Sequence, residues 1–278
     1  LPEEGRTAHV ETALADDAWP VRREAIRALP SLPEAERLRL APAAAKAVSA
    51  ALFGGDPEDL KEAIRAFRSL PGADRALVAA EAPVSGSDAP PAGGDGLAAV
   101  AGRTRLYGGL EGRFFREGFA KTDSGTTLLD AVPTEPGMSL RDRVIVRHIG
   151  IRPFLEWERA FRAADFWRSK GFDYVPIEPI VGVGAGEGLT ADVATRVVPG
   201  PTVAGWAAAA GFTHLDRIVD TQRRIMEGLE ELGIEHGHPH EDNFVLAFDR
   251  DGEGRPDISR PPRVYAIDFD MAAPSGKP

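Results

Sequence analysis

The chain contains no cysteine among its 278 residues. Disulfide bridges, thiolate metal sites and a cysteine nucleophile are therefore excluded. It also lacks an apolar run long enough to cross a membrane, and it shows no secretory leader. These absences predict a cytoplasmic protein that does not insert into a membrane.

Basic residues are in deficit. The 33 lysines and arginines are outnumbered by 43 aspartates and glutamates, which gives a formal net charge of −10. Nucleic-acid binding requires concentrated positive charge, so nucleic acid is not expected as a partner. The hydrophobic content of 43% is ordinary for a globular protein, and the length suits one large domain or two modest ones.

Residues 1–81 show helical periodicity. Apolar residues recur at helical spacing over 9–14, 21–29, 38–53 and 57–70. Asp56 followed by Pro57 is a favourable start for the last of these helices. We therefore predict a small all-helical domain, which offers a surface for a protein partner.

Part of this helical region repeats. The sequence Glu-Ala-Ile-Arg-Ala occurs at 24–28 and again at 62–66, an offset of 38 residues. The pattern around 16–29 resembles the second half of a HEAT repeat, and the offset suits the period of that family. Two helical hairpins without a repeat relation remain an open alternative, because two repeats are few for an independent solenoid.

A change of composition follows the helical region. Residues 82–102 are rich in Pro, Gly, Ser and Asp, which predicts a linker. Beyond it, strand-like and helical patterns alternate, so the chain as a whole is predicted to be α+β. The expected strands are 113–120, 126–132, 143–149, 175–183 and 191–198, and the expected helices are 153–170 and 213–232.

Two polar motifs lie near the end of the chain. The first is His-Gly-His-Pro-His-Glu-Asp-Asn at 236–243, and the second is Ile-Asp-Phe-Asp at 267–270. Short apolar runs flank a turn-rich excursion between them, which predicts a hairpin that brings Asn243 close to Asp268. Amide and carboxylate oxygens placed in this way are suitable ligands for Mg²⁺ bound to phosphates.

This pair of motifs resembles the catalytic loop and the metal-binding Asp of the kinase-like fold, in its aminoglycoside phosphotransferase and ABC1-like branches. Those families have His-Gly-Asp-x-His-x-x-Asn followed by Ile-Asp-Phe-Gly or Ile-Asp-Phe-Asp. The chain matches at His236, Gly237, His240, Asn243, Ile267, Asp268, Phe269 and Asp270. The resemblance implies a two-lobed protein-kinase-like domain over 103–278. It also implies that ATP and Mg²⁺ are cofactors, with Asn243, Asp268 and Asp270 near the metal and a small-molecule or protein hydroxyl as the acceptor.

The chain departs from the family at its catalytic Asp, which is replaced by His238. A neutral imidazole can still accept a hydrogen bond from a substrate hydroxyl and serve as a base, but it supplies no negative charge. Only eight residues follow Asp270, so we expect the kinase-like region to be truncated at its C-terminus. A pseudokinase, in which a nucleotide-binding module recruits a partner with little turnover, is therefore the alternative function.

Arg147 lies in an apolar run that resembles the strand carrying the ATP-contacting Lys of kinases. Strand alternation puts Ile145 on the same face, where it would cover the adenine while Arg147 reaches a phosphate. The expected partner of Arg147 is a Glu of the following helix, Glu158 by preference and Glu156 as the alternative. A solvent-facing strand arginine is the simpler interpretation.

Three further features complete the predicted site. Ser124 and Gly125 lie in a short polar turn that is similar to the phosphate loop of the phosphotransferase branch, although any hairpin favours such a turn. Val198 is at the position of the hinge whose backbone pairs with adenine in that fold. We expect His236 and His240 to brace the backbone around the metal ligands. A metal site made of alternating histidines is the alternative.

Overall fold

A computed structural model of the chain describes residues 3–52, 54, 56–81, 120–121, 126–129, 144–185, 188–196, 198, 200–249 and 256–276. Over these residues the protein is α+β, as predicted, with an N-terminal helical region and small antiparallel sheets. Among them, no helix has the length and apolar character that crossing a membrane requires.

The described chain forms two compact units. The first consists of 3–81 together with 204–220, and the second consists of 120–203 together with 221–276. The sequence-based boundaries assign 204–220 to the kinase-like region, whereas the structure groups these residues with the helical unit. The long helix α11 (Leu215–Glu231) contributes its first six residues to the first unit and the rest to the second.

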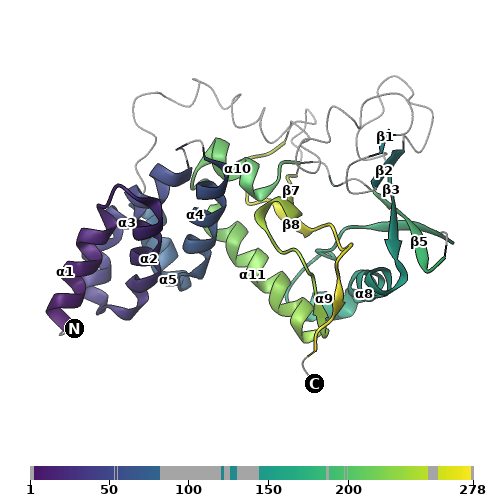
Figure 1. Cartoon of the computed structure of the whole chain (residues 1–278), viewed down its shortest axis with the longest axis horizontal. Helices are drawn as coiled ribbons and strands as arrows, with labels where there is room; N and C mark the ends of the chain where they lie inside the picture. Colours follow the sequence, from purple (N-terminus) through teal and green to yellow (C-terminus); the bar gives the residue numbers. More distant parts are fainter. Residues whose placement is uncertain are drawn as a thin grey trace. The chain divides into compact units, whose positions relative to one another are not determined.

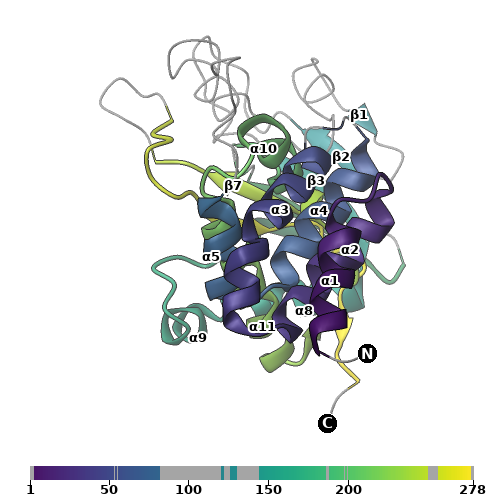
Figure 2. The same cartoon turned by 90° about the vertical axis from the view of Figure 1, so that its left-hand side faces the viewer.

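Over residues 3–81, the first unit contains the four predicted helices and a fifth that was not predicted. They are α1 (Glu3–Leu14), α2 (Trp19–Ala28), α3 (Glu34–Leu52), α4 (Pro57–Ser69) and α5 (Gly72–Ala80). Helix α1 packs on α2 and α3, α2 packs on α4, and α3 packs on α4 and α5 (Figures 1 and 2). Helix α5 escaped prediction because it is short and buries two charged residues, Asp74 and Arg75, which interrupt its apolar stripe.

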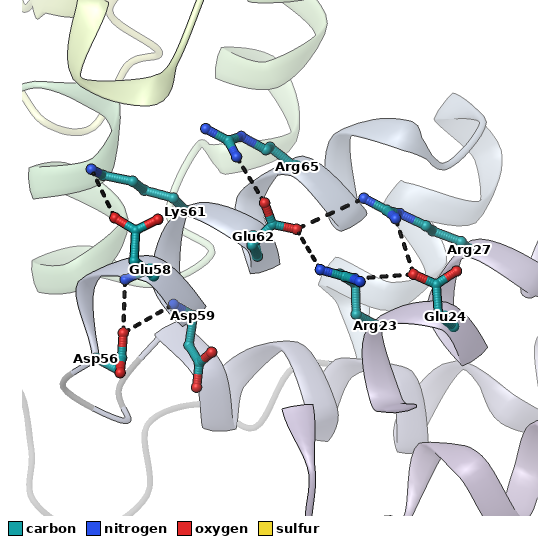
Figure 3. Close-up of polar contacts among 9 residues, drawn as sticks. All are labelled: Arg23, Glu24, Arg27, Asp56, Glu58, Asp59, Lys61, Glu62 and Arg65. Atoms are coloured by element: carbon teal, nitrogen blue, oxygen red, sulfur yellow. Dashed lines mark hydrogen bonds and ion pairs between the residues drawn. The ribbon is translucent and has the colours of Figure 1, made fainter. Parts of the chain in front are cut away.

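The repeated sequence segments lie side by side in α2 and α4. Within each helix the repeated Glu and Arg form an ion pair, Glu24 with Arg27 at 3.0 Å and Glu62 with Arg65 at 2.7 Å. Arg23 links the helices by a 2.9 Å ion pair with Glu62 (Figure 3). These pairs are partly exposed and contribute little, so the fully buried isoleucines of the two segments supply most of the packing. A HEAT-like relation between the helical pairs remains a prediction.

Helix α4 begins where the sequence predicts. The Asp56 carboxylate accepts the backbone N–H groups of Glu58 and Asp59, at 2.8 and 3.3 Å, and Pro57 occupies the first turn. Figure 3 shows the two bonds of Asp56. A side chain that caps the first N–H groups stabilises a helix start, and Pro lacks an N–H that would otherwise be unsatisfied there.

Arg75 of α5 connects the helical hairpins to the later part of the first unit. Its guanidinium is almost fully buried and donates to Asp216 at 2.9 Å, to Asp220 at 3.2 Å and to the Leu70 carbonyl at 2.6 Å.

Helix α10 (Val203–Ala210) precedes α11 and was not predicted, because its alanine-rich sequence has no polar face to set a helical period.

A five-stranded antiparallel sheet forms the core of the second unit. The strands are β1 (Ala120–Lys121), β2 (Thr126–Leu129), β3 (Val144–Gly150), β4 (Ile180–Ala185) and β5 (Thr190–Arg196), in the order β1-β2-β3-β5-β4. In the described residues β3 is central and pairs with β2 on one side and β5 on the other (Figure 1).

The segment between β3 and β4 differs from the prediction. The single expected helix is divided into α8 (Ile151–Arg162) and α9 (Ala164–Ser169), because Ala163 has a non-helical ψ of 45°. Gly171 ends α9 with a φ of +79°, as expected for a glycine stop. Residues 172–179 do not extend β4. They contain two prolines, which have no N–H for a sheet ladder, and they run beside the later strand β8 (Arg263–Ala266) instead.

The last part of the second unit contains the predicted hairpin. Strands β7 (Phe244–Ala247) and β8 (Arg263–Ala266) are antiparallel, with Phe244 opposite Ala266. A short 3₁₀ turn (Glu241–Asn243) precedes β7, and β6 (Ile234–Glu235) pairs with β9 (Ala273–Pro274).

Replacing Arg75 with Met should destabilise the protein by roughly 2 to 3 kcal/mol, because two carboxylates and a carbonyl lose a buried donor. The matched control is Arg39→Met, which removes largely exposed ion pairs with Glu11 and Glu36 and should cost less than about 1 kcal/mol. Urea unfolding followed by circular dichroism measures both changes. Equal losses in the two variants would show that burial of Arg75 is unimportant.

Candidate functional site

The hairpin brings the two predicted metal ligands to the same end. The Ile267 N–H donates to the Asn243 carbonyl at 2.9 Å. Asn243, directly before β7, and Asp268, just after β8, therefore lie at the same end of the hairpin. The Asn243 side chain donates through Nδ2 to the His238 carbonyl at 2.9 Å. This bond orients the amide so that Oδ1, a suitable metal ligand, remains available.

Asp268 is held in an unusual conformation. Its φ is +67°, in the left-handed region that few residues other than Gly adopt, although Asp tolerates it better than most. Its N–H donates to a carboxylate oxygen of Glu178 at 3.1 Å, while its own carboxylate is about one-third exposed and lies 3.6 Å from Arg147. Backbone strain of this kind persists only where the surroundings enforce it, and it is frequent at functional sites.

Glu178 supplies that enforcement. Its carboxylate is fully buried and accepts hydrogen bonds from Arg147 at 2.9 Å, from the Asp268 N–H and from the Thr195 hydroxyl at 3.1 Å. Its backbone is fixed as well, because its N–H donates to Ala266 at 2.8 Å and its carbonyl accepts the Trp157 indole N–H at 3.1 Å. A carboxylate is tolerated in the core when a cation and several hydrogen-bond donors surround it, as they do here.

The structure corrects the predicted partner of Arg147. Glu158 pairs with Arg162 at 2.7 Å and Glu156 pairs with Arg159, both along α8 itself. The helix turns its apolar residues inward, which leaves these glutamates on other faces. The interpretation of Arg147 as a solvent-facing residue is also wrong, since its side chain is 5% exposed.

Sequence reasoning missed Glu178 altogether. The signal was available, because Glu178 is the single charged residue in the apolar run 175–181. A lone carboxylate in such a run requires a buried partner if the run is in the core.

His236 supports the backbone around Asn243 and Asp268. It is fully buried, its Nε2 lies 2.9 Å from the Ile267 carbonyl, and its Nδ1 accepts the His238 N–H at 3.3 Å. Nε2 must therefore carry the proton and donate it, so the ring is neutral. Burial lowers the pKa of His236 to about 4, in agreement with this assignment. The predicted bond of His236 to the backbone is present at Ile267. His240 differs, because its buried Nδ1 has no hydrogen-bond partner among the described residues.

His238 and Asp270 lie on the open side of the site. Gly237, with a φ of +87°, makes the turn that exposes the His238 ring, and a Cβ at that position would meet the Met271 backbone. Asp270 has a buried Oδ1 without a hydrogen-bond partner among the described residues. Burial, followed by the negative charge of Asp268, raises the pKa of Asp270.

Of the other predicted site residues, the structure describes some and not others. Val198 is buried against Val245 and Ile267, with the neighbouring Pro201 carbonyl accepting the Leu246 N–H at 2.9 Å. Ile145, on β3, is paired in register with Leu128 of β2 on one side and with Thr195 of β5 on the other. Ser124 and Gly125 lie outside the described residues, although the strands on both sides of them do pair.

The donor set fits Mg²⁺ chemically. Asp268 and Asn243 carry oxygen atoms, and the Asp270 carboxylate is near enough to Asp268 for that negative charge to raise its pKa. In the described part of the chain, no three His, Asp or Glu side chains gather as a complete metal site. Mg²⁺ commonly takes one or two protein ligands and completes its shell with water and substrate phosphates, so two or three oxygens are sufficient.

Comparisons with known proteins add nothing to this geometry. No protein-family model matches the chain, and no curated protein matches it significantly.

Replacing Glu178 with Gln should destabilise the protein by roughly 3 kcal/mol, because Arg147 keeps its buried charge and loses its nearest counter-charge. The matched control is Glu158→Gln, the sequence-based candidate, which should change stability by less than about 0.5 kcal/mol. Denaturant unfolding of both variants distinguishes the two glutamates. A larger loss in the Glu158 variant would contradict the assignment.

The buried His236 should make stability depend on pH. The unfolded imidazole takes up a proton below pH about 6.5, whereas the folded one does so only near pH 4. Stability should therefore fall as the pH drops from 6.5 to 4, by up to about 3 kcal/mol. His236→Gln preserves a donor and an acceptor but does not titrate. Unfolding free energies of wild type and variant should differ least near pH 4, and a difference independent of pH would rule out this role.

Proposed function

We propose that the protein binds Mg-ATP and transfers a phosphoryl group to a hydroxyl of a small molecule or a protein, with a kinase-like domain after the helical unit. One observation carries the proposal. Asn243 and Asp268 lie at the same end of a hairpin, with oxygen ligands available and with the strained Asp268 backbone anchored by Glu178. This arrangement is suited to holding a hard cation against phosphates.

Each side chain has a defined task in this proposal. Asp268 and Asn243 would hold Mg²⁺, and the Asp270 carboxylate would serve as a third oxygen ligand or as an acceptor for a metal-bound water. Mg²⁺ supplies charge neutralisation on the phosphates when it is bound. Arg147, 3.6 Å from the Asp268 carboxylate, fixes the direction of that side chain.

His238 is the candidate base. Its ring is exposed beside the carboxylates, where an acceptor hydroxyl has access to it. A neutral imidazole accepts the hydroxyl proton as the phosphoryl group is transferred, and the adjacent carboxylates stabilise the imidazolium that results.

A nucleotide-binding interaction module with little turnover is the second candidate, and one observation favours it. Arg147 is buried and holds Glu178 and Asp268, so its guanidinium is committed to protein carboxylates rather than to a nucleotide phosphate. A site that has His238 in place of an acidic base and a committed Arg147 can bind nucleotide without efficient transfer. The helical unit would then recruit the partner.

Calorimetric titration of Mg-ATP into the full chain tests the site. Asp268→Ala and Asn243→Ala should each weaken binding by about tenfold or more, equivalent to about 1.4 kcal/mol. The matched control is Asp165→Asn, which removes an exposed carboxylate of α9 and should leave the affinity unchanged. Magnesium-independent binding, or equal affinity in all variants, would refute the proposed site.

The rate of ADP formation from Mg-ATP, measured for each candidate acceptor protein that binds the chain, separates the two candidate functions. Turnover that is abolished in His238→Ala and retained in His238→Asp supports transfer with a base at this position. Binding without turnover in the wild type, with turnover gained in His238→Asp, supports the interaction module.

A further inference from the structure

A cavity of about 290 Å³ lies in the second unit and shares no lining residue with the site described above. Its walls come from residues 171–174, from α11 at Thr221 and Arg224, and from the turn end of the β7–β8 hairpin at Asp249 and 261–263. Asn243 and Asp268 lie at the other end of the same hairpin.

Arg224 is the distinctive group in this cavity. It is half-buried, its Nη2 donates to the Lys170 carbonyl, and its guanidinium carbon lies 4.6 Å from the centre of the Phe172 ring. A Cβ at Gly171 would lie 3.1 Å from Nη2, so glycine permits the close approach. In the part of the chain that the structure describes, no carboxylate pairs with Arg224, and its remaining N–H groups are left for a ligand.

Tyr174, whose ring centroid lies 5.7 Å from that of Phe172, is held by two hydrogen bonds. The Tyr174 hydroxyl donates to the Val264 carbonyl at 3.1 Å and accepts the Val264 N–H at 2.9 Å. Arg263 covers the Tyr174 ring at 5.6 Å, and its exposed ion pair with Asp173 is long, at 3.8 Å. A ligand would therefore meet aromatic and guanidinium groups that are already in place, which reduces the entropy lost on binding.

The charges of the lining residues select the class of ligand. A planar guanidinium suits a carboxylate or a phosphate, since both accept two parallel N–H donors. Asp173, Asp249 and Arg263 also line the cavity and are exposed, so two carboxylates balance two guanidinium groups, and this lining suits a ligand that carries both an anionic and a hydrogen-bond-donating group better than a dianion. The same two carboxylates can accept hydrogen bonds from a hydroxyl or an ammonium group of the ligand.

We propose that this cavity binds a small carboxylate ligand that carries a hydroxyl or an ammonium group, with Arg224 as the anchor of its carboxylate. The volume is at the lower end of the range for small-molecule sites, which suits a ligand of amino-acid or hydroxy-acid size. This site is independent of nucleotide binding and stands whether or not the protein is a phosphotransferase.

Nuclear magnetic resonance of the ¹⁵N-labelled full chain tests the proposal. L-Serine, sodium lactate, sodium phosphate and sodium chloride are titrated separately at constant ionic strength, and the amides of Phe172 and Asp173 and the Arg224 side-chain N–H are followed. Serine or lactate should give saturable shifts that are at least tenfold stronger in affinity than those of phosphate. Arg224→Gln should weaken the binding at least tenfold, and Arg224→Lys should weaken it less.

The neighbouring Arg223 provides the matched control, because it is exposed and pairs with Glu227 at 2.6 Å on α11. Arg223→Gln should leave the affinity unchanged, and Asp249→Asn should strengthen phosphate binding by removing a repulsive charge. Shifts that equal those with chloride, or that survive in Arg224→Gln, would overturn the site. Phosphate binding as tight as that of the carboxylates would overturn the assigned ligand class.

Discussion

The fully buried carboxylate of Glu178 is the contact on which the second unit depends. It joins β3 through Arg147, β5 through Thr195 and the end of the β7–β8 hairpin through the Asp268 N–H. A buried charge is tolerated only when it is paired and hydrogen-bonded, so these three groups and Glu178 require one another. The strained backbone at Asp268 exists because this network holds it.

The segment that carries Glu178 also connects the two sites. Residues 172–179 lie beside β8, with Tyr174 bonded to Val264 near one end and Glu178 bonded to Ala266 at the other. Its prolines prevent ordinary sheet pairing, so its position is fixed by a few specific hydrogen bonds. One irregular segment therefore lines the cavity that is proposed to bind a carboxylate and orients the candidate metal-binding residues.

The helical unit illustrates the difference between pattern and packing. Helices α1 to α4 follow from apolar periodicity and capping, which are local properties. Helix α5 does not, because its buried Arg75 is favourable only where Asp216 and Asp220 of α11 meet it. The grouping of 204–220 with this unit has the same cause, since a contact across more than 120 residues leaves no local pattern to detect.

The sequence by itself determined the α+β class, the first four helices, the β7–β8 hairpin and the proximity of Asn243 and Asp268, because turn chemistry and strand alternation are local. Only the tertiary structure decided which carboxylate pairs with Arg147. Helix phase directs Glu158 to Arg162, whereas the fold places Glu178, 31 residues beyond Arg147, within 2.9 Å of it. Burial and partner choice are properties of packing, and residue spacing alone does not contain them.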